Sequence, residues 1–152
     1  MNPTHNSPTQ AAIKTYQNFY QHWMQNAGLE MSALPDATSK LQAVAQPLPL
    51  ALIAYYHCAG TSPINTAYNE LLLPGDLYVE QEHLIFMHEN QGVVDWGIHL
   101  QDLDQDDPIV WQRNNDDGAW YAEDHHLSSF LMACWYWAEF GEDKTEDFFK
   151  LG

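Results

Sequence analysis

The stretch that decides the fold covers residues 83–112 and reads HLIFMHENQGVVDWGIHLQDLDQDDPIVWQ. Residues 84–87 are a short run of β-forming side chains bounded by polar residues, which is typical of a strand. Asn90 and Gly92 supply turn chemistry, because both residue types tolerate a positive φ. Val94, Trp96 and Ile98 then alternate with polar or small residues. The stretch therefore predicts two strands joined by a tight turn, with the second strand buried on one face.

Working outward toward the C-terminus, an acidic loop leads to a third strand. Pro108 has no N–H to donate, so it suits the first residue of that strand. Residues 115–118, with the sequence NDDG, are a hairpin-turn signal that predicts a returning strand. Alternation along that strand places Trp120 and Ala122 on one side, and Tyr121 and Glu123 on the other. We expect the sheet to span about residues 77–123.

The rest of the chain carries helical patterns. Apolar residues recur at three- and four-residue steps between about residues 8 and 27, after Pro8 and before Gly28. A helix after Pro49, stopping at Gly60, is expected to carry Leu50, Ile53, Ala54 and His57 on one face, with His57 as a partly buried structural histidine. C-terminal helices are expected over about residues 126–151, the first ending at Gly141 and the second short and acidic. With no linker or repeat, the chain is predicted to form one α+β domain over residues 1–152.

Charge is distributed unevenly. The net charge is −16; residues 1–76 hold four acids and two bases, a net of −2, and residues 77–152 hold seventeen acids and three bases, a net of −14. Such a surface repels phosphate groups, so we expect no binding to nucleic acid or to an anionic membrane. Its natural complement is a basic protein, although acidity also simply favours solubility.

Cysteine usage and the N-terminus bear on the compartment. Cys58 and Cys134 both lie in apolar stretches, where a free thiol behaves as a small core residue. No disulfide framework or signal peptide is expected, which favours the reducing cytoplasm. The longest apolar run, residues 47–56, is far shorter than the roughly 20 residues that a membrane span needs.

The sequence matches known metal-binding and catalytic motifs only weakly. Asp102, Asp104 and Asp106 match the first, third and fifth positions of a calcium loop, but Asp107 stands where that loop needs Gly and Arg113 where it needs Glu. His125 and His126 are adjacent, so they diverge on a helix or a strand and rarely share one metal ion. We find no nucleophile elbow and no phosphate-binding glycine loop. We therefore expect no metal, no cofactor and no catalytic residues.

Several motifs together resemble the SUKH superfamily, which contains the yeast cell-wall assembly regulator and many bacterial toxin-immunity proteins. The resemblance covers about residues 47–140. A departure from the family pattern is Ile109, where a second proline is often seen. The motif residues are Glu89, Asn90, Gln91 and Gly92 in the turn, the pair Trp96 and Gly97, and Asp107 and Pro108 before the third strand.

The resemblance implies helices packed on an antiparallel, meandering sheet, and a binding protein rather than an enzyme. Bacterial members look like immunity proteins that neutralise a cognate toxin, often a nuclease or a deaminase. A second hypothesis is a regulatory adaptor with several partners, as in the eukaryotic relatives, and a third is an unrecognised metal-dependent enzyme. The identity of the partner and the oligomeric state stay open.

Within the region of resemblance we expect two kinds of residue, one structural and one that faces the partner. Trp96, Gly97 and Pro108 are expected to be structural, as an inward-facing side chain, a close backbone approach and the start of a strand. Exposed carboxylates are expected to face the basic partner. These are Asp102, Asp104, Asp106, Asp116, Asp117, Glu123 and Asp124.

Overall fold

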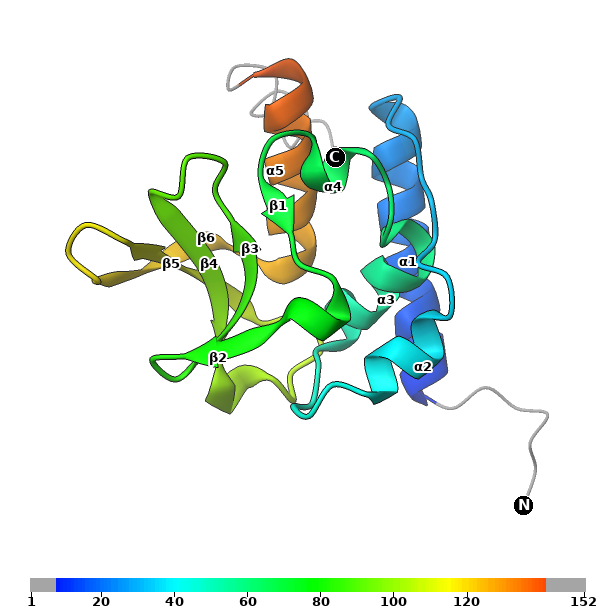
Figure 1. The fold of residues 1–152 in the computed structure, drawn as a ribbon. Helices are drawn as coiled ribbons and strands as arrows, with labels where there is room; N and C mark the ends of the chain where they lie inside the picture. Colours follow the sequence, from blue (N-terminus) through cyan, green and yellow to red (C-terminus); the bar gives the residue numbers. More distant parts are fainter. Residues whose placement is uncertain (1–7, 142–152) are drawn as a thin grey trace.

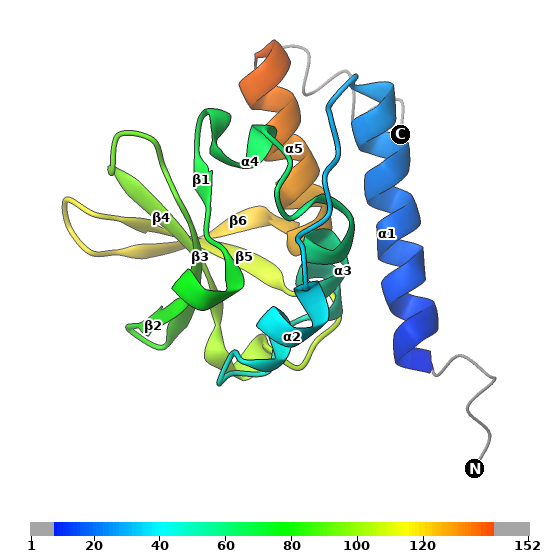
Figure 2. The ribbon, with the colours of Figure 1, turned by 45° about the vertical axis from the view of Figure 1, so that its right-hand side comes forward.

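Helices gather on one side of an antiparallel sheet in the computed structural model, which describes residues 8–141. Figure 1 and Figure 2 show α1, α3 and α5 together on that side, and the β5–β6 hairpin projecting away from them. The α+β class predicted from the sequence is confirmed. The helices are α1 (Pro8–Asn26), α2 (Ala37–Gln42), α3 (Leu50–Ala59), α4 (Ile64–Ala67) and α5 (Leu127–Phe140), with short 3-10 turns η1 (Pro74–Asp76) and η2 (Leu100–Asp102).

The sheet is a meander with one short strand added at an edge. Its order is β1-β3-β4-β5-β6, and β2 also pairs with β3. The strands are β1 (Glu70–Leu71), β2 (Tyr78–Glu80), β3 (His83–His88), β4 (Val94–His99), β5 (Ile109–Asn114) and β6 (Trp120–His126). The prediction of residues 77–123 missed β1 and the end of β6. A strand of two residues is too short to show a periodicity in the sequence. Glu70 and Leu71 form β1 by pairing with His88 and Met87, which lie far along the chain.

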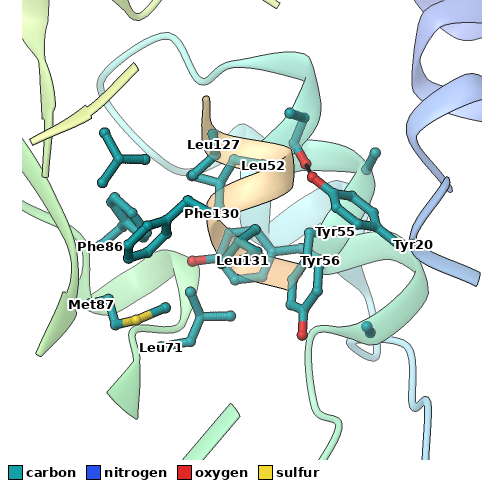
Figure 3. Packing of buried hydrophobic residues seen from close by; sticks show 14 of the residues in the cluster. Tyr20, Leu52, Tyr55, Tyr56, Leu71, Phe86, Met87, Leu127, Phe130 and Leu131 are labelled. Carbon is teal, nitrogen blue, oxygen red and sulfur yellow. Dashed lines mark hydrogen bonds between the residues drawn. The ribbon is translucent and has the colours of Figure 1, made fainter. Parts of the chain in front are cut away.

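The core joins the sheet to three helices, with α3 between α1 and the sheet (Figure 2). Figure 3 shows Phe86 of β3 beside Phe130 of α5, and Tyr20 of α1 against α3. The Tyr20 hydroxyl donates to the carbonyl oxygen of Ala51 at 2.7 Å, so a buried phenol is satisfied by helix backbone. These contacts join α5 to β3 and α1 to α3.

The single face expected for α3 describes only part of what this helix buries. His57 is partly buried as expected, but Leu50 and Ile53 are only partly buried too, whereas α3 buries Ala51, Leu52, Ala54, Tyr55, Tyr56 and Ala59. A helix at the centre of the core contacts neighbours around most of its circumference, so a single apolar stripe does not describe it. Gly60 follows α3 for reasons of space, because a Cβ there would lie 2.7 Å from Leu34 Cβ.

The first and last helices of the described region begin and end close to the residues expected from the sequence. The first helix, expected over residues 8–27, spans Pro8–Asn26, and Gly28 after it has φ +71°. The last main helix begins at Leu127 and ends at Phe140. The predicted acidic helix over residues 142–151 lies outside the described residues. Among helices of residues 8–141, none combines the length and apolar character needed to cross a membrane.

Candidate functional site

A groove of about 590 Å³ lies where β4, β5 and β6 meet α5 and the segment before β1. Register explains its position. Trp96 pairs with Gln112, and Gln112 pairs with Tyr121, so these side chains share the helix-facing side of the sheet. Phe130 of α5 packs on Phe86 and Trp96 in the inner strands. The groove is lined by Tyr68, Asn69, Glu89, Trp96, Gln112, Glu123, His125, Phe130, Ala133, Cys134 and Trp137.

Trp96 fixes one carboxylate of the groove. Its ring belongs to the buried core, with its centroid 5.6 Å from that of Phe130. Its indole Nε1–H donates to Glu123 Oε1 at 2.9 Å. Because alternation along β6 turns Glu123 toward the helices, the bond holds this acidic group against the groove rather than in open solvent.

Glu89 is the second carboxylate of the groove, and it organises the β3–β4 turn. Its Oε1 accepts from the backbone N–H groups of Gln91 at 2.8 Å and Val93 at 3.1 Å. Gly92 has φ +73°, which explains why glycine stands there. The backbone N–H of Asn90 donates to Asn69 Oδ1 at 3.2 Å. The turn motif therefore ties the segment before β1 to the end of the groove.

Aromatic side chains form the exposed rim. Tyr68 and Trp137 are 41% and 40% exposed, and their rings meet edge to face with centroids 5.3 Å apart. Exposed large aromatics are enriched in protein interfaces. Sequence reasoning left both residues out of the site, although a tryptophan at the edge of the α5 apolar face was a usable signal.

The thiol in the groove is not activated. Burial raises the pKa of Cys134 to about 12, so the thiol stays protonated near neutral pH. Asn69 Nδ2 donates to Cys134 Sγ at 3.4 Å, and the thiol lies 3.8 Å from Met87 Sδ. These contacts give Cys134 the surroundings of a core residue rather than those of a nucleophile.

The structure distributes the predicted partner-facing carboxylates over separate places. Asp102, Asp104 and Asp106 lie in and after η2, at the end of β4 marked by His99. Asp116 and Asp117 lie at the β5–β6 hairpin tip, beyond the opposite end of β4, because Val94 pairs with Asn114. Figure 1 shows this hairpin tip well away from the η2 loop. Asp124 faces the side of β6 opposite Glu123. The seven side chains thus form no single surface.

Three of the motif residues make contacts within the protein that hold its elements together. Asp107 accepts from the backbone N–H and the hydroxyl of Ser128, at 2.8 Å and 2.6 Å, and so caps the start of α5. Pro108 immediately precedes β5, and its carbonyl oxygen accepts from the N–H of Leu127 at 2.8 Å. A Cβ on Gly97 would lie 3.0 Å from the carbonyl oxygen of Leu84.

The opposite face of the sheet carries a polar and aromatic network centred on Arg113. This guanidinium is buried, donates to Asp95 at 2.7 Å and Glu80 at 3.3 Å, and lies 5.3 Å from the Trp120 ring centre. Trp120 also stacks on His83 at 3.7 Å. β4 was expected to be buried on one face, but Asp95 and Gly97 are buried too, so this expectation was wrong. The network covers the second face.

The β2–β3 turn beside this network has an unusual backbone. Gln81 and Glu82 both have positive φ, 51° and 63°, without being glycine. The Gln81 side-chain oxygen accepts from Trp120 Nε1 at 2.9 Å, and its backbone oxygen lies 2.7 Å from His83 Nδ1. These contacts stabilise a conformation that L-residues adopt at some cost.

The two adjacent histidines lie at the end of β6 and so project to opposite faces. His125 lines the groove, whereas His126 Nδ1 lies 2.6 Å from the backbone oxygen of Asp107. Within residues 8–141, no three His, Cys, Asp or Glu side chains are grouped closely enough to hold a metal ion.

Comparisons with known proteins leave the family open. No protein-family model, no curated protein and no solved structure matches the chain.

Proposed function

We propose that this protein is a non-catalytic binding domain that neutralises a basic protein, namely a bacterial toxin of the nuclease or deaminase type. The resemblance to the SUKH superfamily supports the immunity role, and the charge of the molecule supports the nature of the partner. A nuclease must present a basic surface to phosphate groups, and an acidic protein can occupy that surface instead. The cytoplasm is the compartment in which such a protein would act.

The observation that carries this proposal is the lack of compensating cations on the sheet side. Within residues 77–141, Arg113 is the one lysine or arginine, against thirteen acids. Its guanidinium is buried and already bound to Asp95 and Glu80. The remaining carboxylates of this described region have no lysine or arginine partner within it. Carboxylates that lack a lysine or arginine partner in the described part of residues 77–152 favour a cationic partner and speed the encounter with it.

Tagged co-purification from the native cell, eluted across a salt gradient, tests the proposal. We expect one basic protein, bound in stoichiometric amount and released by rising salt, because salt screens exposed charges. Several weak partners would instead favour the regulatory adaptor. An empty column, or a neutral partner indifferent to salt, would contradict the proposal.

Charge-reversal variants then show which carboxylates face the partner. The seven predicted carboxylates form four sets, which are changed to lysine in four separate variants because they lie apart: the η2 loop (Asp102, Asp104 and Asp106), the hairpin tip (Asp116 and Asp117), Glu123, and Asp124. Asp107 is kept, since it caps α5. The control carries Gln21→Lys and Gln25→Lys, exposed positions of α1, and changes the net charge as much as Glu123→Lys does.

At least one reversal set is expected to weaken the complex, mainly through slower association for exposed rim charges. The α1 control is expected to bind like the unmodified protein. Affinity equal to that of the unmodified protein for all four reversal sets would rule out an electrostatic mode of neutralisation.

A further inference from the structure

The groove beside α5 holds negative charge that the described protein does not neutralise. Glu89 and Glu123 each use Oε1 for the hydrogen bonds described above, and the Oε2 atom of each accepts none within residues 8–141. Neither carboxylate forms an ion pair with a described residue. Both are partly exposed, so a ligand can reach them. The two acids therefore remain available to a cation from outside.

The aromatic rim adds a second kind of contact for the same cation. Tyr68 and Trp137 expose large parts of their rings at the groove. A guanidinium is flat, stacks on aromatic faces and donates in a fork to carboxylates, whereas an ammonium is a compact and strongly hydrated charge. Rings beside carboxylates thus suit arginine better than lysine.

The two groove carboxylates are held rigidly, which also favours the binding of a cation between them. Trp96 holds Glu123 from the core, and two backbone N–H groups hold Glu89. A ligand that binds both acids does not have to immobilise them first, which lowers the entropic cost of binding. The volume of about 590 Å³ lies within the roughly 300–1,000 Å³ of ligand pockets, so a long side chain can enter.

We infer that the groove receives an arginine side chain of the basic partner, with its guanidinium between the groove carboxylates and the aromatic rim. This inference rests on the proposed function for the source of the arginine, namely a protein. It assigns Glu89 and Glu123 as the acceptors, and Tyr68 and Trp137 as the stacking surface.

Indole N–H signals in a nitrogen-labelled sample of the full chain provide the test. The probe is N-acetyl-arginine amide, with the neutral citrulline analogue as its isosteric control, and the variants Trp96→Phe and Trp137→Phe assign the two groove signals. We expect the Trp96 and Trp137 signals to shift saturably with the arginine probe and to move little with the citrulline analogue. Trp111 and Trp120, on the opposite face, are internal controls and stay in place.

Two variants make the test specific. Glu123→Gln retains an acceptor for Trp96 but removes the charge, and is expected to weaken probe binding about tenfold. Asp36→Asn removes a charge of the same sign at an exposed position before α2 and is expected to leave probe binding unchanged.

Failure of this inference is distinguishable from failure of the proposed function. No shift, equal shifts with the citrulline analogue, or equal shifts of Trp111 and Trp120 would overturn the arginine groove, even if co-purification yields a basic partner. A groove that binds the probe in a chain that captures no basic protein would support the arginine site and contradict neutralisation.

Discussion

The indole N–H of Trp96 and the carboxylate of Glu123 meet at 2.9 Å, although β5 lies between their strands. Adjacent strands lie about 4.8 Å apart, so the tryptophan side chain spans the width of a strand to reach its acceptor. Trp96 thus packs its ring in the core and holds Glu123 at the groove through its N–H group.

The Trp96–Glu123 bond is expected to contribute measurably to stability. In a double-mutant cycle of Trp96→Phe and Glu123→Ala, we expect a coupling free energy of about 0.5–1.5 kcal/mol, because each change alone removes a partly buried hydrogen bond. Urea unfolding of the four proteins measures it. Strictly additive effects would show that the bond contributes nothing to folding.

Capping of α5 by Asp107 gives a second prediction. Asp107→Ala should lower the free energy of unfolding by about 1–2 kcal/mol, since the Ser128 N–H and hydroxyl lose their acceptor. Asp104→Ala, an exposed carboxylate in the same loop, is the matched control and should change stability by less than about 0.5 kcal/mol. Urea unfolding compares them, and equal losses would contradict the capping role.

Arg113 is expected to be important for stability. Arg113→Met should cost about 3–5 kcal/mol, because the buried Asp95 carboxylate is left without its cation. Arg113→Lys should recover only part of this loss, as lysine cannot reproduce the forked contacts. Lys14→Met, on the exposed side of α1, should be nearly neutral. If Arg113→Met unfolds at the same urea concentration as Lys14→Met, the network is not stabilising.

Close packing at Gly97 gives a further prediction. Gly97→Ala places a methyl group 3.0 Å from the Leu84 carbonyl oxygen and 3.2 Å from His83 Cβ, and should cost about 1–3 kcal/mol. Gly75→Ala meets nothing within 4 Å and should be neutral or slightly stabilising. Thermal unfolding distinguishes the two variants, and a Gly97→Ala protein as stable as the parent would show that β3 can shift.

Stability should also depend on pH through His83. Burial lowers the pKa of His83 below its ordinary value, so the folded protein binds its proton less well than the unfolded chain. The folded state is therefore not penalised by His83 above the pKa of the unfolded chain, about 6.5. As the pH falls from there through the lower pKa of the folded protein, the free energy of unfolding decreases. His83→Phe retains a ring beside Trp120 but cannot titrate.

Urea unfolding at about pH 7.5 and about pH 5.5, on either side of the ordinary histidine pKa, measures this dependence. The loss of stability on acidification should be smaller in His83→Phe than in the parent. His22→Gln, at an exposed position of α1, should retain the dependence of the parent protein. An unchanged dependence in His83→Phe would assign the effect to other groups.

Much of the architecture followed from local patterns. The alternation around Trp96, the turn ending at Gly92 and the glycine of the 115–118 hairpin specified β3 to β6, because a period of two and a positive φ are properties of single residues and their neighbours. The long helices α1 and α5 followed from their apolar spacing for the same reason. The helix α3 was also found, between Pro49 and Gly60, but neither β1 nor the full set of residues that α3 buries could be found in this way, since both depend on what packs around them.

The candidate site was less accessible from sequence. The chain by itself determined that acids dominate residues 77–152 and that Glu89, Trp96 and Glu123 lie on or beside strands. Only the tertiary structure decided that Tyr68 and Trp137 join Glu89 and Glu123 at one groove, and that the η2 and hairpin carboxylates lie at opposite ends of β4. The physical reason is that charge and periodicity are written along the chain, whereas strand register and the placement of α5 depend on contacts between segments far apart in sequence.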